Sequence, residues 1–150
     1  MQACYAHTNL IAHDWQRLAT FYTQVFGCTF VPPERDYQNE ALDRGTGLSN
    51  AHLRGGHFRL PGYTEAGPTL EIYTYDELAA TLPAAVNRPG FGHLAFEVAD
   101  VIQARDEVRA YGGHAIGEIV TLTTSAGRHV TWCYVTDPEG NILELQAWSS

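Results

Sequence analysis

The chain has 150 residues, enough for one domain with its own hydrophobic core or for two small halves that share one. Apolar residues make up 45% and charged residues 17%, as in soluble globular proteins. Nine basic and seventeen acidic residues give a net charge of −8, so neither nucleic acid nor an anionic membrane is expected as a partner. All nine basic residues are arginine, which excludes Schiff-base and phosphate-loop chemistry based on lysine.

The amino-terminal sequence and the cysteines favour a cytoplasmic protein. No apolar run reaches the ~18 residues that a membrane span needs, and MQACYAHTNL lacks the pattern of a signal peptide. The three cysteines, Cys4, Cys28 and Cys133, form no CxxC pair. We interpret them as small buried hydrophobic residues.

The first half predicts a strand, a helix and three further strands. After the strand YAHTNL, Asp14 caps a helix whose apolar residues recur at helical spacing and which stops at Gly27. The strands CTFVPP, AHLRGGHFRLP and TLEIYTY follow. Within segment 31–50, which is polar and bounded by Pro and Gly, we expect a loop over one face of the sheet, with EALDR as a candidate short helix.

The second half repeats this order. The strand FGHLAFEV precedes Asp100, the cap of a second helix, and Gln103 lies three residues later, as in a capping box. HAIGEIVTLTT, RHVTWCYV and, after the turn DPEGN, ILELQ supply three more strands. The same sequence separation joins His7 to His93 and Asp14 to Asp100. The sequence thus predicts an α+β fold with one module at about 1–76, a linker at about 77–90 and a second module at about 91–150.

Two histidines and two glutamates fall at equivalent positions of the halves, on the strand faces that point away from the helices. They are His7, Glu71, His93 and Glu144. Two halves related by a two-fold would bring them into one cleft. Imidazole and carboxylate ligands suit a divalent Zn, Ni, Co, Mn or Fe ion. Such an ion would stabilise an enediolate, and a ligating carboxylate that loosens could act as a general base.

Simpler interpretations stay open for single residues. A glutamate in an apolar strand can pair with an arginine such as Arg54 or Arg59, although two buried carboxylates without strong compensation would destabilise the fold by roughly several kcal/mol each. Tyr73 and Trp132 are candidates for lining a pocket, yet aromatic strand residues are as often core. His57 and Arg59 lie near the first-half pair and could touch substrate.

Three segments make the chain resemble the vicinal oxygen chelate superfamily, which includes glyoxalase I, methylmalonyl-CoA epimerase, extradiol dioxygenases and fosfomycin- or bleomycin-resistance proteins. These segments are HTNLIAHDWQRLATFYTQVFGC, GFGHLAFEVADV and VTDPEGNILELQ. The resemblance covers nearly the whole chain. It implies two tandem βαβββ modules whose eight strands form a cup around a metal ion, with the two His and two Glu at the metal positions.

The ligand set looks most like that of bacterial glyoxalase I and, less closely, that of the epimerase. It implies a lactoylglutathione lyase-like enzyme or an isomerase that moves a proton next to a carbonyl through a metal-bound enediolate. Glu144 is the expected base, with Glu71 as the alternative; Tyr73, Arg59 and Trp132 are expected to contact the substrate. The substrate would be a small carbonyl compound, such as a thiol conjugate or an acyl thioester. The protein is expected to be a homodimer. An Fe-dependent ring-cleaving dioxygenase and a metal-free protein that binds an aromatic ligand or an antibiotic are the alternatives.

Overall fold

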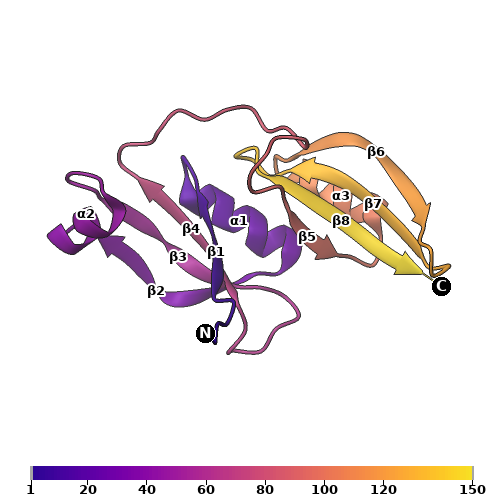
Figure 1. The fold of residues 1–150 in the computed structure, drawn as a ribbon, viewed down its shortest axis with the longest axis horizontal. Coiled ribbons are helices and arrows are strands. Elements are labelled where there is room, and N and C mark those ends of the chain that lie inside the picture. The colour runs from indigo at the N-terminus through magenta and orange to yellow at the C-terminus, as the bar shows by residue number, and fades with distance from the viewer. Residues whose placement is uncertain (1, 150) are drawn as a thin grey trace. The chain divides into compact units, whose positions relative to one another are not determined.

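The chain forms two compact units, residues 1–81 and 82–150, and each has one sheet and at least one helix (Figure 1). This architecture comes from a computed structural model that describes residues 2–149. Unit 1 contains, in chain order, β1 (His7–Ile11), α1 (Trp15–Phe26), β2 (Thr29–Tyr37), α2 (Glu40–Thr46), β3 (Leu53–Arg59) and β4 (Thr69–Tyr75). Unit 2 contains β5 (Leu94–Glu97), α3 (Val101–Ala110), β6 (His114–Thr123), β7 (His129–Thr136) and β8 (Ile142–Ser149).

The two four-stranded sheets have the same topology. The strand order is β1-β4-β3-β2 in unit 1 and β5-β8-β7-β6 in unit 2. In each sheet the first strand is parallel to the last, and the other pairs are antiparallel. The register also repeats, because Asn9 pairs with Glu71 and Ala95 pairs with Glu144. The predicted fold of two βαβββ modules is therefore confirmed, whereas the joining of both sheets into one eight-stranded cup stays a prediction.

Helix α1 begins and ends where the sequence predicts. The Asp14 carboxylate accepts a hydrogen bond from the Arg17 amide, and Gly27 ends the helix in the left-handed conformation that glycine adopts without strain. The Thr74 hydroxyl on β4 accepts from the Trp15 amide and donates to the carbonyl of Ala12, which fixes the start of the helix on the sheet.

The core of unit 1 lies between α1 and the helix-facing side of β4. Leu18 and Tyr22 from the helix and Leu70 and Ile72 from the strand are all fully buried. Each such side chain contributes roughly 1.5–3 kcal/mol through burial. Strand alternation then turns Glu71 and Tyr73 to the opposite face of the same sheet.

In unit 2, α3 packs on β6, β7 and β8. Asp100 caps the helix as predicted, and its carboxylate accepts from the amides of Ile102 and Gln103. The second contact of the predicted capping box, from the Gln103 side chain back to the Asp100 amide, is wrong. The Gln103 side chain donates to Glu107 Oε1 at 2.9 Å, one turn further along the helix.

The segment that the sequence assigns to a loop is partly strand. β2 continues through the consecutive prolines Pro32 and Pro33 to Tyr37, with a register shift between Val31 and Arg35. β2 is one of the two edge strands of its sheet, so its outer side needs no amide donors and tolerates proline. The short helix expected at EALDR is confirmed as α2, which Asn39 caps.

The DPEGN turn sets the start of β8. Asp137 is fully buried, and its carboxylate accepts from the backbone amides of Glu139 and Asn141 and from the Asn141 side chain. Gly140 supplies the positive φ of 88° that the turn needs. This turn connects β7 to β8 and thereby places Glu144 on its strand.

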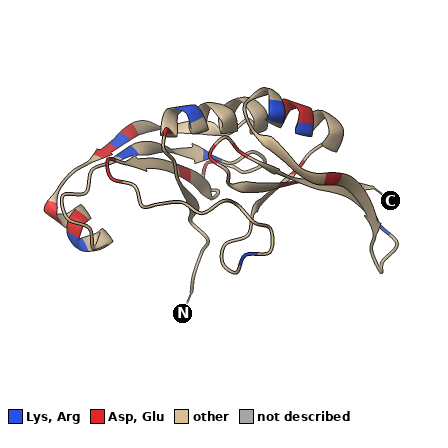
Figure 2. Cartoon of the chain, turned by 90° about the horizontal axis from the view of Figure 1, so that it is seen from above, with Lys and Arg blue, Asp and Glu red and all other residues tan. Residues whose placement is uncertain are grey.

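The cysteine prediction holds for two of three residues. Cys28 and Cys133 are buried, whereas Cys4, which precedes β1, is exposed. Acidic and basic residues are mixed along α2 and α3 (Figure 2). None of the helices that the structure describes is long and apolar enough to span a membrane.

Candidate metal centre

The first His–Glu pair joins two neighbouring strands of unit 1. His7 Nε2 on β1 lies 3.4 Å from Glu71 Oε2 on β4, and the Asn9 side chain donates to the same oxygen at 3.0 Å. Glu71 is well shielded, with 13% of its side chain exposed, whereas His7 is 46% exposed. Without these donors, the shielded position of Glu71 would destabilise its charged carboxylate.

His57 on β3 contacts the same carboxylate from the other side. Its Nε2 lies 3.1 Å from Glu71 Oε1 and 2.9 Å from the Tyr73 hydroxyl. Burial lowers the pKa of His57, and burial together with the Glu71 charge raises the pKa of Tyr73 to about 12. From the sequence, His57 is only a possible substrate contact. The antiparallel register that pairs His57 with Glu71 was the missing information.

The second His–Glu pair in unit 2 has fewer partners. His93 Nε2 lies 3.0 Å from Glu144 Oε2. Tyr134 occupies the place of His57 opposite the glutamate, and its ring lies 5.1 Å from that of His93. Ala95 occupies the place of Asn9. Among the described residues, His93 is the one hydrogen-bonding or ion-pairing partner of the Glu144 carboxylate.

Both pairs have a donor spacing that a divalent ion accepts. Two ligand atoms at about 2.1 Å from one cation and at right angles to each other are about 3.0 Å apart. The observed separations of 3.0 Å and 3.4 Å between imidazole nitrogen and carboxylate oxygen are close to this value. Within residues 2–149, however, no group of three or more His, Cys, Asp or Glu side chains is arranged to hold a metal ion. The four ligands therefore appear as two pairs, one in each unit, and their meeting at one cation stays a prediction.

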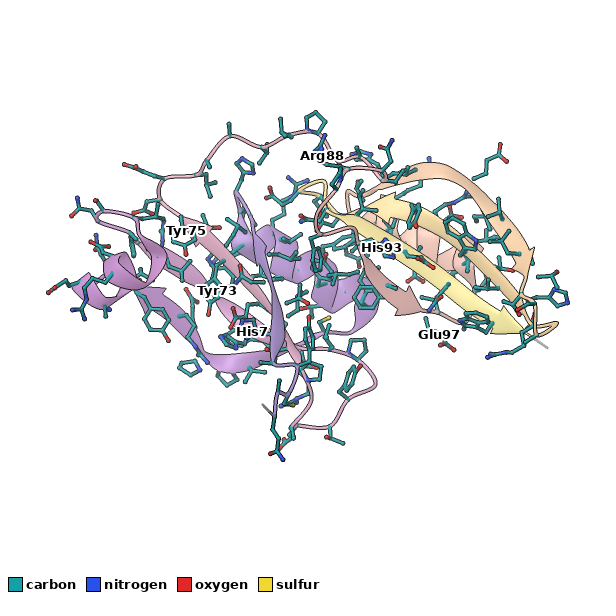
Figure 3. The ribbon with its side chains drawn as sticks, viewed as in Figure 1. His7, Tyr73, Tyr75, Arg88, His93 and Glu97 are labelled. Carbon is teal, nitrogen blue, oxygen red and sulfur yellow. The ribbon has the colours of Figure 1, made fainter. Side chains whose placement is uncertain are left out.

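Figure 3 shows His7 on β1 beside Tyr73 on β4 in unit 1, and His93 just before β5 in unit 2. The register puts Arg59 on the same sheet face as Glu71, and Trp132 on the same face as Glu144. Tyr73 also shares the face of Glu71, and its buried ring packs over Gly55. Substrate contact by these three residues remains a prediction.

The arginine pairing that would explain Glu71 without a metal is wrong for Arg54. This guanidinium pairs with Asp76. In the part of the chain that the structure describes, no arginine forms an ion pair with Glu71 or Glu144. The partners of both carboxylates are imidazole and amide groups, which are compatible with a bound cation.

A further charged cluster lies outside these pairs. Both ring nitrogens of His52 contact carboxylates at 2.8 Å, Nδ1 that of Asp76 and Nε2 that of Asp36. These hydrogen bonds raise the pKa of His52, and the His52 contact lowers the pKa of Asp76. The cluster ties together β2, the residue before β3 and the residue after β4, and we interpret it as structural.

The comparisons with known proteins agree with this architecture. A glyoxalase family protein from Bacillus cereus is 17% identical, with a TM-score of 0.84, and the match covers 100% of this chain and 97% of that one. The fosfomycin resistance protein FosX from Listeria monocytogenes is 17% identical over 99% of this chain and 96% of its own, with a TM-score of 0.63. A glyoxalase family protein from Enterococcus faecalis is 21% identical, with a TM-score of 0.57 and coverage of 93% and 94%.

A search of curated proteins gave no match. The sequence model of one family matches residues 5–145, which contain both modules and all four candidate ligands. The chain belongs to the Glyoxalase/Bleomycin resistance protein/Dioxygenase superfamily.

Proposed function

We propose that this chain is a metal-dependent enzyme that moves a proton next to the carbonyl group of a small substrate. The observation that carries the proposal is the repeated pair: His7 with Glu71 and His93 with Glu144, each at ligand-like spacing. Corresponding strands of the two units bear the two glutamates at the same register, so the duplication repeats the donors together with the fold.

The four side chains would hold one divalent ion, which is Zn, Ni, Co, Mn or Fe by the chemistry of the ligands. When bound, the ion supplies positive charge that acidifies the proton on the carbon next to a carbonyl. Similar folds bind such ions, since FosX has been solved with Mn(II) and sulfate. That comparison supports the presence of a metal and not a particular reaction.

The partners of the two glutamates support different roles for them. Glu71 accepts from Asn9 and contacts His57, so its carboxylate is held in place. Within residues 2–149, Glu144 has the single partner His93, so its carboxylate is less restrained than that of Glu71. Glu144 therefore takes the proton from the carbon next to the carbonyl, while Glu71 remains a fixed ligand. The proton goes back to the adjacent carbon in a lyase of the glyoxalase I type and to the original carbon in an epimerase. Both reactions begin with this removal of a proton next to the carbonyl.

The partner molecules follow from the same proposal. The substrate is a carbonyl compound, either free or as a thiol conjugate or acyl thioester, and neither nucleic acid nor membrane takes part. We also propose that the protein acts as a homodimer in the cytoplasm. Sedimentation of the purified protein would test the dimer.

The experiment uses exchange of carbon-bound protons. Protein loaded with Mn²⁺ is mixed in D₂O with hydroxyacetone or with the hemithioacetal of methylglyoxal, and loss of the proton next to the carbonyl is followed by NMR. We expect exchange that stops on chelation of the metal. Glu144→Gln should abolish exchange and keep the metal, whereas Glu71→Gln should weaken metal binding.

The two alternatives give different results in the same samples. A ring-cleaving dioxygenase would consume oxygen with catechol when loaded with Fe²⁺. A metal-free binding protein would hold no stoichiometric ion and catalyse no exchange. Unchanged exchange in both glutamine variants would rule out the proposed base and its alternative.

A further inference from the structure

One histidine near the candidate metal centre has no counterpart in the second unit. His57 lies opposite Glu71 across the β3–β4 ladder, and the residue at the same place opposite Glu144 is Tyr134. The His57 ring touches two groups through one nitrogen, at 3.1 Å from Glu71 Oε1 and 2.9 Å from the Tyr73 hydroxyl. The Tyr134 hydroxyl has no hydrogen bond to Glu144 within the residues described. The two halves therefore differ in how they support their carboxylates.

We propose that His57 is a positioning residue, which fixes the Glu71 carboxylate so that Oε2 faces His7 and is ready to bind a cation. An ionised carboxylate can only accept hydrogen bonds, so Nε2 carries the proton in this contact. That proton is shared between Glu71 Oε1 and the Tyr73 oxygen. The Asn9 amide occupies one lone pair of Oε2 and leaves the other for the ion.

The rest of the sheet makes this support rigid. The Tyr73 ring lies over Gly55, two residues before His57 on the same strand face, because glycine has no side chain to displace it. Tyr73 is 5% exposed, so its hydroxyl is a fixed anchor rather than a mobile one. The contacts from Tyr73 to His57 and from His57 to Glu71 thus connect two residues of β4 through one residue of β3.

This inference rests on the proposed function where it concerns the metal, but its core is a contact between two side chains. Partners behind a metal ligand orient that ligand, and their loss typically weakens metal binding about 10–100-fold. His57→Phe removes the donor and keeps an aromatic ring. His57→Gln keeps an N–H donor. Tyr134→Phe is the matched control, because it removes a polar atom from the same place in unit 2.

The first measurement is titration of the metal-free protein with Mn²⁺, together with the visible spectrum of the Co²⁺-loaded protein. We expect His57→Phe to weaken Mn²⁺ binding about 10–100-fold and to alter the Co²⁺ bands. His57→Gln should recover most of the affinity, and Tyr134→Phe should stay within about twofold of the parent protein. Equal affinities for the parent protein and His57→Phe would overturn the proposal.

The second measurement needs no metal. A double-mutant cycle combines His57→Phe with Glu71→Ala and follows denaturant unfolding in the presence of a chelator. We expect the two positions to be coupled by roughly fivefold or more in the unfolding equilibrium constant. Zero coupling would refute the inference whatever the metal results. Coupling in a protein that binds no Mn²⁺ would confirm that His57 positions Glu71 and would refute the metal-dependent function.

Discussion

Gly55 is the position where one added methyl group should disturb the candidate site most. In Gly55→Ala the new Cβ would lie 2.1 Å from the Ile72 carbonyl oxygen and 2.8 Å from the Tyr73 Cα, whereas an ordinary contact begins at 3.4 Å. Both atoms belong to the backbone of β4, so rotation of a side chain cannot relieve the overlap. β3 and β4 would have to separate by roughly 1 Å, which exceeds what close-packed strands absorb.

Overpacking of this kind typically destabilises a protein by about 1–3 kcal/mol, and backbone overlap places Gly55→Ala at the upper end. The assay is denaturant unfolding followed by circular dichroism, with the midpoint and the slope compared with those of the parent protein. Gly45→Ala is the control. Gly45 lies inside α2, and a Cβ there meets no atom within 4 Å.

Gly45→Ala should stabilise the protein by about 0.5–1 kcal/mol through helix propensity. The two substitutions add the same atom and should change stability in opposite directions. Equal unfolding free energies for Gly55→Ala and the parent protein would refute the close approach of β3 and β4, and with it the geometry that places Tyr73 against His57.

Two further predictions concern titratable groups. Burial raises the pKa of Cys28 to about 12, so iodoacetamide at pH 8 should label one thiol of the native protein, exposed Cys4, and all three in denaturant; rapid labelling of a second native thiol would contradict the buried core. The pKa of His52 is raised above 6.5, so its carboxylate contacts stabilise the fold below pH 6.5 and are lost as the pH rises through the folded-state pKa. The pKa of Asp76 is lowered below 3.8. The free energy of unfolding lost in His52→Gln should therefore be greatest between pH 3.8 and pH 6.5, where His52 is charged and Asp76 is ionised. A difference between the two proteins that does not vary with pH would show that the cluster does not titrate with folding.

The sequence predicted the elements that depend on local signals. Asp14 and Asp100 begin helices, Gly27 ends one, and alternation assigns Glu71 and Glu144 to the sheet faces opposite the helices. These features follow from a few neighbouring residues, and the duplication supplied the helix caps and the strand glutamates twice. The repeat therefore made the fold class and the positions of the two His–Glu pairs predictable together.

Features that depend on distant pairing were missed. The prolines of β2 indicated a loop, and only its place at the edge of the sheet makes a strand acceptable. From the sequence, His57 is only a possible substrate contact, because cross-strand register, which places it opposite Glu71, cannot be read from one strand. In a capping box the Gln103 side-chain oxygen would accept from the Asp100 amide. Instead, the Gln103 side-chain amide donates to Glu107, and this contact depends on side-chain geometry.

The central claim is that both modules bind one and the same divalent ion. Calorimetric titration of the metal-free protein with Mn²⁺ tests it most directly when repeated on His7→Ala and His93→Ala. Loss of tight binding in each variant, with a stoichiometry of one ion per four ligands in the parent protein, is the expected result. Tight binding that survives either substitution would contradict the claim, because one unit would then hold the ion without the other.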